Sequence, residues 1–392
     1  MKKKYLIYIL FLFFAKSSFA QLQLSVYSEV SIITAGPGTE LYEAFGHSAL
    51  RIKDPVLQLD LIYNYGMFDF NAPNFYSNFT KGKLIYKLGR YRFDYFLRGY
   101  NSDKRWIKEQ VLNLTRDEKQ AFFTYLEKNA APQNASYFYD PYFNNCATKL
   151  RDITQEVLGD KISWNDEDIE ANLSFRQLMN REIPWNTWGS FGINLALGSK
   201  LDQKADFKEY MYLPDYVYSI FKNSTIQLNN ENTSLVKKEN TILQYDELQQ
   251  NTSLLSPFLI FSLLSLLGLF VTFKDYKNRV RTKALDFILL FVTGIIGVLI
   301  VFLWFFTDHS TTPNNFNVLW AFAPNLILAF LLLKQRNLAW FYKYFIVLIG
   351  FLFFIPMIWI SGIQLFPTSI VPLLILFFVR YLYLVTYFKP KS

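Results

Sequence analysis

The sequence predicts an α+β exported domain followed by an all-α membrane domain of five transmembrane helices. Three features lead to this prediction. A basic N-terminus runs into a short apolar stretch, five long apolar runs occupy the last third of the chain, and the residues between them mix strand-like and helical patterns. That middle part, about 230 residues, is long enough for one domain with a sizeable core.

The N-terminus has the parts of a secretory signal peptide. Residues 2–4 are lysines, residues 5–15 form an apolar core, and Ala20 ends a small-residue cleavage site. We therefore expect a signal peptide at residues 1–20, an exported catalytic domain at 21–250 and a membrane domain at 251–392. The exported domain would enter an oxidising compartment.

Five apolar runs follow a sharp change of composition close to residue 253. Each has close to the roughly 20 residues that a helix needs to span a bilayer. They lie near 253–273, 285–306, 316–333, 338–360 and 365–388.

The connections between these runs alternate in charge. The first and third connections and the C-terminal end carry lysines and arginines, whereas 307–317 and 361–369 carry none. Basic loops stay on the cytoplasmic side of a membrane. We therefore expect a protein of a bacterial inner membrane, with residues 21–250 outside the cytoplasm and the C-terminus inside it. The formal net charge of +8 follows largely from these loops and the signal peptide, so it indicates no nucleic-acid partner.

Cys146 is the only cysteine among 392 residues. Apolar residues recur after it at three- and four-residue spacing as far as Gly159, which predicts a helix that begins at the cysteine. Asn144 or Asn145 would cap this helix, and the N–H groups of its first turn favour a thiolate. The alternative is an inert buried cysteine. We favour a nucleophile, because a lone thiol in an exported protein has no disulfide partner and is open to oxidation.

His47 is the histidine of the exported domain, and the chain has only two. Residues 47–53 and 57–68 read as strands with a turn near residue 55, so they predict a hairpin. His47 would lie across from about residue 62 to Asn64, with Asn64 as the nearest polar partner for the imidazole and Asp60 as the alternative.

A thiol nucleophile needs a base, and the exported domain offers only one imidazole. This predicts a Cys146–His47 dyad by elimination. The sequence has no G-x-S-x-G elbow, H-E-x-x-H, C-x-x-C, phosphate-binding loop or dinucleotide fingerprint. With one cysteine and two widely separated histidines it also lacks a zinc ligand set, so we expect no metal and no cofactor.

Other segments give coarser predictions. Residues 76–97 are dense in aromatic residues and read as strands or as an aromatic wall. Residues 103–114 and 115–129 read as helices with solvated charged faces. Residues 181–198 read either as core or as an apolar patch that touches the bilayer or an acyl chain. Residues 223–251 are polar and read as a linker.

Two motifs and the architecture resemble a known family. The strand at 45–51, FGHSALR, precedes the helix start at 144–148, NNCAT, in the order of circularly permuted papain-like enzymes of the NlpC/P60 and LRAT-like type. With residues 63–70, the five C-terminal runs and the loop at 308–320, essentially the whole mature chain resembles the Lnb-type lipoprotein N-acyltransferases.

The resemblance implies that Cys146 is the nucleophile and His47 the base. It does not fix a third catalytic residue, because LRAT-like enzymes often carry a second histidine further along and this chain has none there; Asn64 is our inference from the hairpin. Asp308 and His309 either position a headgroup or acceptor amine or belong to an ordered loop. The candidate substrate-binding residues are Asn145, Tyr65, Arg51, Asp308 and His309.

The implied reaction moves an acyl chain from a membrane phospholipid, through a thioester on Cys146, to the α-amino group of a diacylglyceryl-cysteine lipoprotein. The expected partners are therefore a phospholipid acyl donor, a diacylated lipoprotein acceptor and the membrane. Two alternatives stay open. A membrane-tethered cysteine peptidase or amidase of cell-wall peptides would need a charged groove, and a non-enzymatic envelope sensor or scaffold would leave Cys146 distant from His47.

Overall fold

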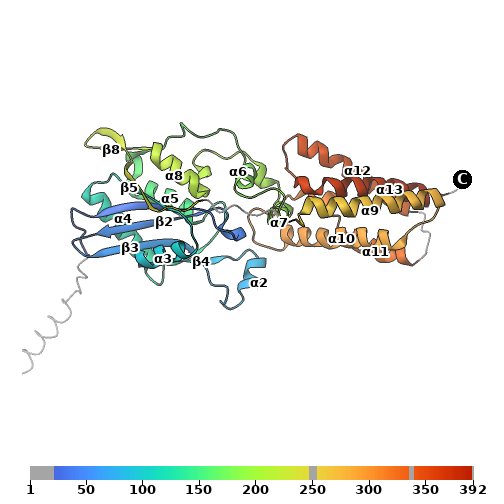
Figure 1. The fold of residues 1–392 in the computed structure, drawn as a ribbon, viewed down its shortest axis with the longest axis horizontal. Helices are drawn as coiled ribbons and strands as arrows, with labels where there is room; N and C mark the ends of the chain where they lie inside the picture. The colour runs from blue at the N-terminus through green and yellow to red at the C-terminus, as the bar shows by residue number, and fades with distance from the viewer. Residues whose placement is uncertain (1–21, 247–253, 335–339, 391–392) are drawn as a thin grey trace, which may run out of the picture.

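The computed structural model describes residues 22–246, 254–334 and 340–390 (Figure 1). A sheet-rich domain forms one end of the molecule and a bundle of long helices forms the other. This confirms the predicted α+β domain followed by a helical membrane domain. The predicted signal peptide at residues 1–20 lies outside the described residues.

The main sheet is antiparallel throughout its described strands, in the order β10-β5-β1-β2-β3-β4-β6. The strands are β1 (Glu29–Ala35), β2 (His47–Asp54), β3 (Leu59–Met67), β4 (Ile85–Arg92), β5 (Ile107–Leu112), β6 (Ser136–Phe138) and β10 (Val236–Leu243). A smaller sheet joins β7 (Ile162–Ser163), β8 (Thr225–Leu228) and β9 (Glu231–Ser234).

Successive side chains of a strand point to opposite faces of the sheet, and along the central strands of the main sheet both faces are apolar. One face packs against α4 (Arg116–Ala130), α5 (Cys146–Leu158) and α8 (Pro214–Asn223). The other face, which includes Ala49 and Ile62, packs against α3 (Phe93–Ser102). The predicted β2–β3 hairpin and the predicted helix from Cys146 to Gly159 are therefore confirmed.

Two predictions about the exported domain are wrong. Residues 103–114 were expected to form a helix, but they contain β5, which lies between β1 and β10. Its charged residues are not solvated as expected, since Glu109 is buried in an ion pair with Arg51. Residues 223–251 were expected to be a linker, yet they form three strands as far as Leu243. Polar residues suit these strands because each keeps a solvated face.

Four helices of the membrane domain, among the described residues, are long and apolar enough to cross a bilayer. These are α9 (Pro257–Asn278), α10 (Lys283–Phe305), α12 (Phe341–Ile360) and α13 (Val371–Phe388), the last lengthened by a short turn that begins at Thr368. The third predicted run instead forms a short turn, η5 (Phe316–Leu319), and the helix α11 (Asn325–Leu333) of 9 residues.

The break between η5 and α11 is packed against α10. Gly294 and Gly297 lie where an added Cβ would meet the backbone of Leu326 at 2.2 Å and of Ala321 at 2.1 Å. The two glycines therefore let the irregular backbone lie directly on α10. Irregular backbone at membrane depth needs such protein cover, because lipid satisfies none of its polar groups.

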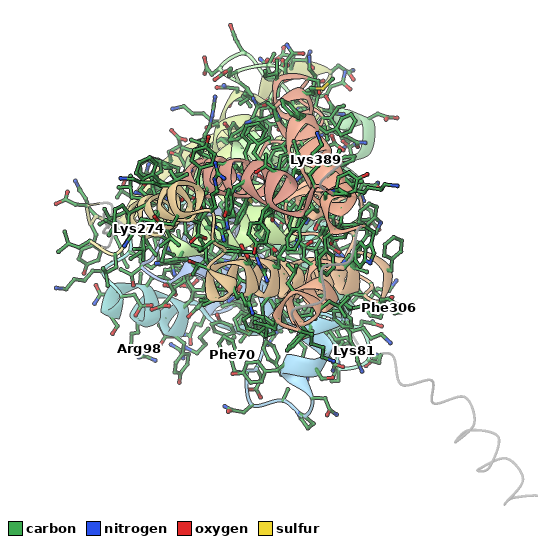
Figure 2. The ribbon with its side chains drawn as sticks, turned by 90° about the vertical axis from the view of Figure 1, so that its right-hand side faces the viewer. Phe70, Lys81, Arg98, Lys274, Phe306 and Lys389 are labelled. Carbon is green, nitrogen blue, oxygen red and sulfur yellow. The ribbon has the colours of Figure 1, made fainter. Side chains whose placement is uncertain are left out.

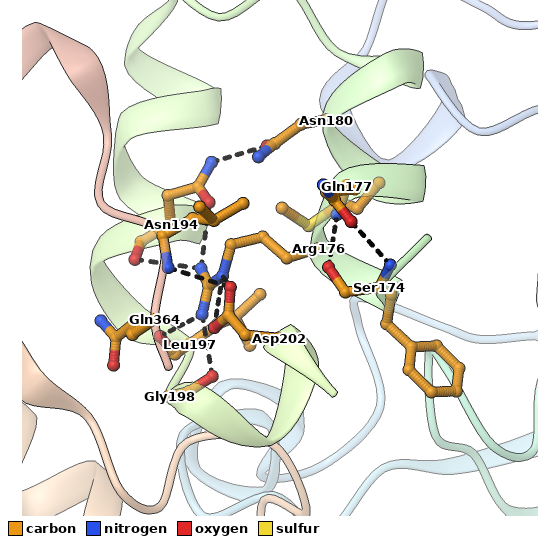
Figure 3. Close-up of polar contacts among 12 residues, drawn as sticks. Ser174, Arg176, Gln177, Asn180, Asn194, Leu197, Gly198, Asp202 and Gln364 are labelled. Carbon is orange, nitrogen blue, oxygen red and sulfur yellow. Dashed lines mark hydrogen bonds and ion pairs between the residues drawn. The ribbon is translucent and has the colours of Figure 1, made fainter. Parts of the chain in front are cut away.

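A buried arginine joins the two domains. Arg176 of α6 (Phe175–Glu182) forms two hydrogen bonds of 3.0 Å with Asp202, and it also donates to the carbonyls of Leu197 and Gly198 (Figure 3). Asp202 in turn accepts the N–H of Leu365 from the α12–α13 connection, at 3.0 Å. These contacts of Arg176 and Asp202, which we call the Arg176 clamp, therefore connect α6 directly to the membrane bundle.

The segment 181–198 lies at this domain boundary. Its helix α7 (Trp188–Ala196) places Phe191 in the core of the membrane domain, with its ring 5.0 Å from that of Phe261. Trp185 and Trp188 remain about half exposed beside the start of α9. The core interpretation is therefore confirmed for Phe191, and contact of the exposed tryptophans with the bilayer or an acyl chain stays a prediction.

Replacing Arg176 is predicted to loosen this clamp. Arg176→Met would leave the Asp202 carboxylate, 2% exposed, without its counter-charge. Removing one partner of a buried pair costs about 3–5 kcal/mol, so the thermal unfolding midpoint in detergent should fall by several degrees. The matched control is Arg181→Met, whose pair with Glu170 is exposed and should contribute less than about 1 kcal/mol. Equal midpoints for the two variants would contradict this account.

Candidate active site

Cys146 is the first residue of α5, and Asn145 fixes it there. The side-chain oxygen of Asn145 accepts the N–H groups of Ala147 and Thr148 at 3.0 and 2.9 Å. Its amide nitrogen donates to the carbonyls of Pro141 and Tyr212 at 2.7 and 2.8 Å. Asn145, a predicted substrate-binding residue, is thus a buried cap whose side chain is fully used in holding the thiol's helix.

His47 lies at the start of β2, and its imidazole lies close enough to the Cys146 side chain for the two groups to shift each other's pKa. Its Nε2 lies 2.6 Å from Oδ1 of Asn64 on β3, which leaves Nδ1 for the sulfur. Nδ2 of Asn64 donates to the Tyr91 hydroxyl at 2.8 Å. The structure therefore brings the three predicted catalytic residues together in one line.

The hairpin register differs slightly from the expected one. Leu50 pairs with Tyr63, so His47 lies beyond Asn64 along the hairpin and not directly across from it. Asn64 reaches the imidazole diagonally, from the face that both side chains share. Asp60, the alternative partner, instead forms an ion pair of 2.7 Å with Arg51.

Cys146 and His47 each stabilise the charged form of the other. Burial raises the pKa of the Cys146 thiol, but the His47 charge, its hydrogen bond and the N–H groups of Ser48 and Ala147 outweigh burial, so the pKa is lowered. Burial lowers the pKa of His47, but the Cys146 charge and the hydrogen bonds with Cys146 and Asn64 outweigh it, so the pKa is raised. Both shifts favour a thiolate–imidazolium pair.

A glycine leaves room at the thiol. Gly66 has φ +93°, and its Cβ, if present, would lie 3.8 Å from Cβ of Cys146 and 3.6 Å from the Tyr139 ring. The β3–β4 register is irregular between Asn64 and Met67, just where Gly66 lies. This bulge brings the thiol from the α5 face to the imidazole at the end of β2, although the two residues belong to opposite faces of the sheet.

Aromatic and cationic groups that the sequence did not single out support the imidazole. Tyr100 of α3 stacks on the His47 ring, with centroids 6.5 Å apart and an interplanar angle of 15°. The guanidinium of Arg105 lies over the Tyr100 ring, 4.7 Å from the ring centroid. It is held by the Gly36 carbonyl at 2.8 Å and by Glu43 at 3.2 Å. No sequence motif marks these residues, because only the fold brings them to β2.

The loop before Cys146 is tied to the membrane domain. One oxygen of Asp140 accepts the N–H groups of Tyr142 and Phe143 at 2.9 and 3.0 Å. Its other oxygen accepts the hydroxyl of Ser310, from the loop between α10 and η5. The outer loop of the membrane bundle therefore holds the turn that precedes Cys146.

The remaining candidates lie around this centre and not at the thiol–imidazole contact. Arg51 is buried in ion pairs with Asp60 and Glu109. Tyr65 is 4% exposed and packs in the core beside Tyr137. Asp308 and His309 contact the segment around Lys81 and Gly82, where the N–H of Asp308 donates to the Lys81 carbonyl at 2.8 Å.

The fold and the site define a membrane protein whose exported domain holds a buried cysteine beside an oriented histidine. Residues 15–188 match the model of the Lnb N-terminal periplasmic domain, and residues 249–391 match that of the Lnb transmembrane domain. The chain therefore belongs to the Lnb family and carries a periplasmic N-terminal domain. No curated protein and no solved structure matches the chain.

The pKa shifts predict how the thiol reacts with an alkylating reagent. Since the pKa of Cys146 is lowered from its usual value, alkylation by iodoacetamide should stay fast below roughly pH 8.5 and slow only as the pH falls through the lowered pKa. In His47→Ala, burial is no longer offset, so the pKa should rise and the rate at pH 7 should fall by roughly tenfold or more.

The control for this measurement is the second histidine. His309→Ala should keep the pH profile of the unaltered protein, because His309 contacts Phe79 and not the thiol. A His47→Ala profile that matches the unaltered one would show that the imidazole does not set the charge of Cys146.

Proposed function

We propose that this protein is a lipoprotein N-acyltransferase with Cys146 as its nucleophile, His47 as its base and Asn64 as the residue that orients the base. Membership of the Lnb family suggests an enzyme of lipoprotein biogenesis. The observation that carries the proposal is the line from the Cys146 sulfur through the His47 imidazole to the Asn64 side chain, 2.6 Å from Nε2. This is the arrangement of a thiol nucleophile, its base and an orienting group.

In the first step the thiolate attacks an ester carbonyl of a phospholipid. The carbon–oxygen bond to glycerol breaks, the His47 imidazolium gives its proton to the leaving alkoxide, and a lysophospholipid departs. The acyl chain remains on Cys146 as a thioester, and the imidazole is neutral.

In the second step the α-amino group of a diacylglyceryl-cysteine lipoprotein attacks the thioester. The neutral imidazole takes a proton from the amine, the carbon–sulfur bond breaks, and the thiolate–imidazolium pair is restored. The N–H of Cys146 itself, at the start of α5, is suited to hold the oxyanion in both steps.

The membrane domain gives this chemistry its location. Both substrates are lipids, and we propose that the membrane domain, with five spans and a cytoplasmic C-terminus, holds the site at the outer face of the inner membrane. Confinement to one surface raises the effective concentration of donor and acceptor. The order of His47 strand and Cys146 helix supports a circularly permuted papain-like arrangement for the exported domain.

The alternatives account for fewer observations. A binding-only sensor predicts that the cysteine and the histidine are distant from each other, whereas here each side chain is close enough to shift the pKa of the other. A cell-wall peptidase would use the same three residues but needs a charged groove. The surroundings of the thiol are mainly aromatic: Tyr139 flanks Gly66, and its ring stacks on Tyr86 with centroids 4.3 Å apart.

Loss of the nucleophile or base is predicted to change lipoprotein N-termini. In cells that depend on this protein, Cys146→Ser and His47→Ala should accumulate diacyl lipoproteins, because a general base contributes roughly 10²–10⁴-fold to rate. Asn64→Ala should show a smaller loss, since it only orients the base. Mass spectrometry of the N-terminal lipopeptides measures this. Arg181→Met serves as the surface control, and unchanged triacyl species in Cys146→Ser would refute the acyltransferase.

The thioester itself is a second predicted outcome. Purified protein incubated with phospholipid and without acceptor should carry one acyl group on Cys146, because the second step then lacks its amine. Intact-mass measurement should show the added mass, and neutral hydroxylamine should remove it. A hydroxylamine-resistant adduct, or full activity without an adduct, would point to a different nucleophile.

A further inference from the structure

The connection between β3 and β4 exposes an unusual number of large apolar side chains. We call residues 67–86, which include α2 (Phe75–Thr80), the aromatic segment. Its exposed members are Met67 at 42%, Phe70 at 48%, Tyr76 at 70%, Phe79 at 50% and Ile85 at 57%. Single exposed apolar residues are ordinary, but a cluster of this kind indicates an apolar partner.

The aromatic segment lies where the helices leave the bilayer. Its turn at Gly82 has φ +76°, and a Cβ there would lie 2.5 Å from the backbone nitrogen of His309. The neighbouring Lys83 lies 4.0 Å from Asp308. Both contacts are with the loop that follows α10, one of the four described helices long and apolar enough to cross a bilayer, so the segment is fixed beside the end of that helix.

The segment extends beyond the bundle at this level. Figure 2 looks along the molecule from the helical end, and it shows Phe70 and Lys81 beyond the outline of the membrane helices. Figure 1 likewise places α2 between the sheet and the helices, on the side of α10. Within the chain these rings contact only part of their surroundings, with Phe79 beside His309 and Phe70 beside Tyr42, and their exposed sides are free to face the outer leaflet.

A row of rings continues from the exposed side chains to the thiol. Phe70 contacts Phe68 at a centroid distance of 4.8 Å, Phe68 contacts Tyr86 at 5.1 Å, and Tyr86 contacts Tyr139 at 4.3 Å. Tyr139 borders Gly66 beside Cys146. The row offers a continuous apolar surface between the leaflet and the nucleophile.

From these observations we infer that the aromatic segment is the acyl-chain site of the enzyme. Its exposed rings enter the outer leaflet, and the row from Phe68 to Tyr139 holds one acyl chain of the phospholipid donor beside Cys146. The exposed Lys81 and Lys83 lie at the same end and suit the phosphate of the headgroup. Aromatic rings with lysines are typical of elements that bind at a membrane surface. The inference rests on the proposed function for its choice of substrate.

Photo-crosslinking tests the lipid contact without catalysis. Cys146→Ala protein would be reconstituted in vesicles of phosphatidylethanolamine and phosphatidylglycerol that contain a phospholipid with a diazirine at the end of one acyl chain. After illumination, peptide mapping should find crosslinks in residues 67–86 as well as in the membrane helices. Crosslinks confined to α9–α13 would overturn the inference, whatever the reaction of the enzyme.

A comparison of two donors tests the role of the segment in acylation. The double variant Phe70→Ser/Phe79→Ser should form the acyl-enzyme at least tenfold more slowly from long-chain phospholipid, but at an unchanged rate from a soluble short-chain thioester. Tyr27→Ser, 70% exposed and distant from the membrane domain, is the matched control. Equal losses with both donors, or none, would overturn the inference. If the unaltered protein accepts neither donor, the proposed function fails, and the crosslinking still decides the lipid contact.

Discussion

The site depends on one interaction, the electrostatic coupling between the Cys146 thiol and the His47 imidazole. Cys146 is buried and His47 is half-buried, and the loss of solvent alone would favour the neutral form of each group. Together they stabilise opposite charges, and Asn64 adds a hydrogen bond that fixes the ring. Because each charge stabilises the other, any change that separates the two groups weakens the charged form of both.

The backbone keeps the two groups in contact across the end of a sheet. The thiol comes from the helix on one face, and the imidazole belongs to the other face with Tyr100 and Phe96. They meet because β2 begins at His47 and because Gly66 places no side chain between α5 and β3. The Asn145 cap then sets where the first turn of α5 begins. The geometry therefore depends on main-chain positions more than on side-chain packing.

These main-chain features explain what the sequence predicted and what it did not. A helix that starts at Cys146 and a hairpin that contains His47 are local patterns, and both were predicted. The strand β5 was taken for a helix, because its burial between β1 and β10 is set by distant partners. Asp308 and His309 were singled out in the outer loop, but their neighbour Ser310 makes the hydrogen bond to Asp140, since only the fold decides which loop residue faces the nucleophile's turn.

The loop between α10 and η5 also fixes the position of the site relative to the membrane domain. It is bonded to Asp140 before the nucleophile, to Lys81 in the aromatic segment and to Gly198 beside the Arg176 clamp. A loop held at three places cannot shift relative to one of them without straining the others. The proposed transfer between two lipids would require the sulfur at a constant height above the leaflet, because a displacement of even 1 Å lowers the rate of an oriented reaction strongly. In the proposed reaction the domain interface would therefore position Cys146, although none of its residues contacts the thiol or the imidazole.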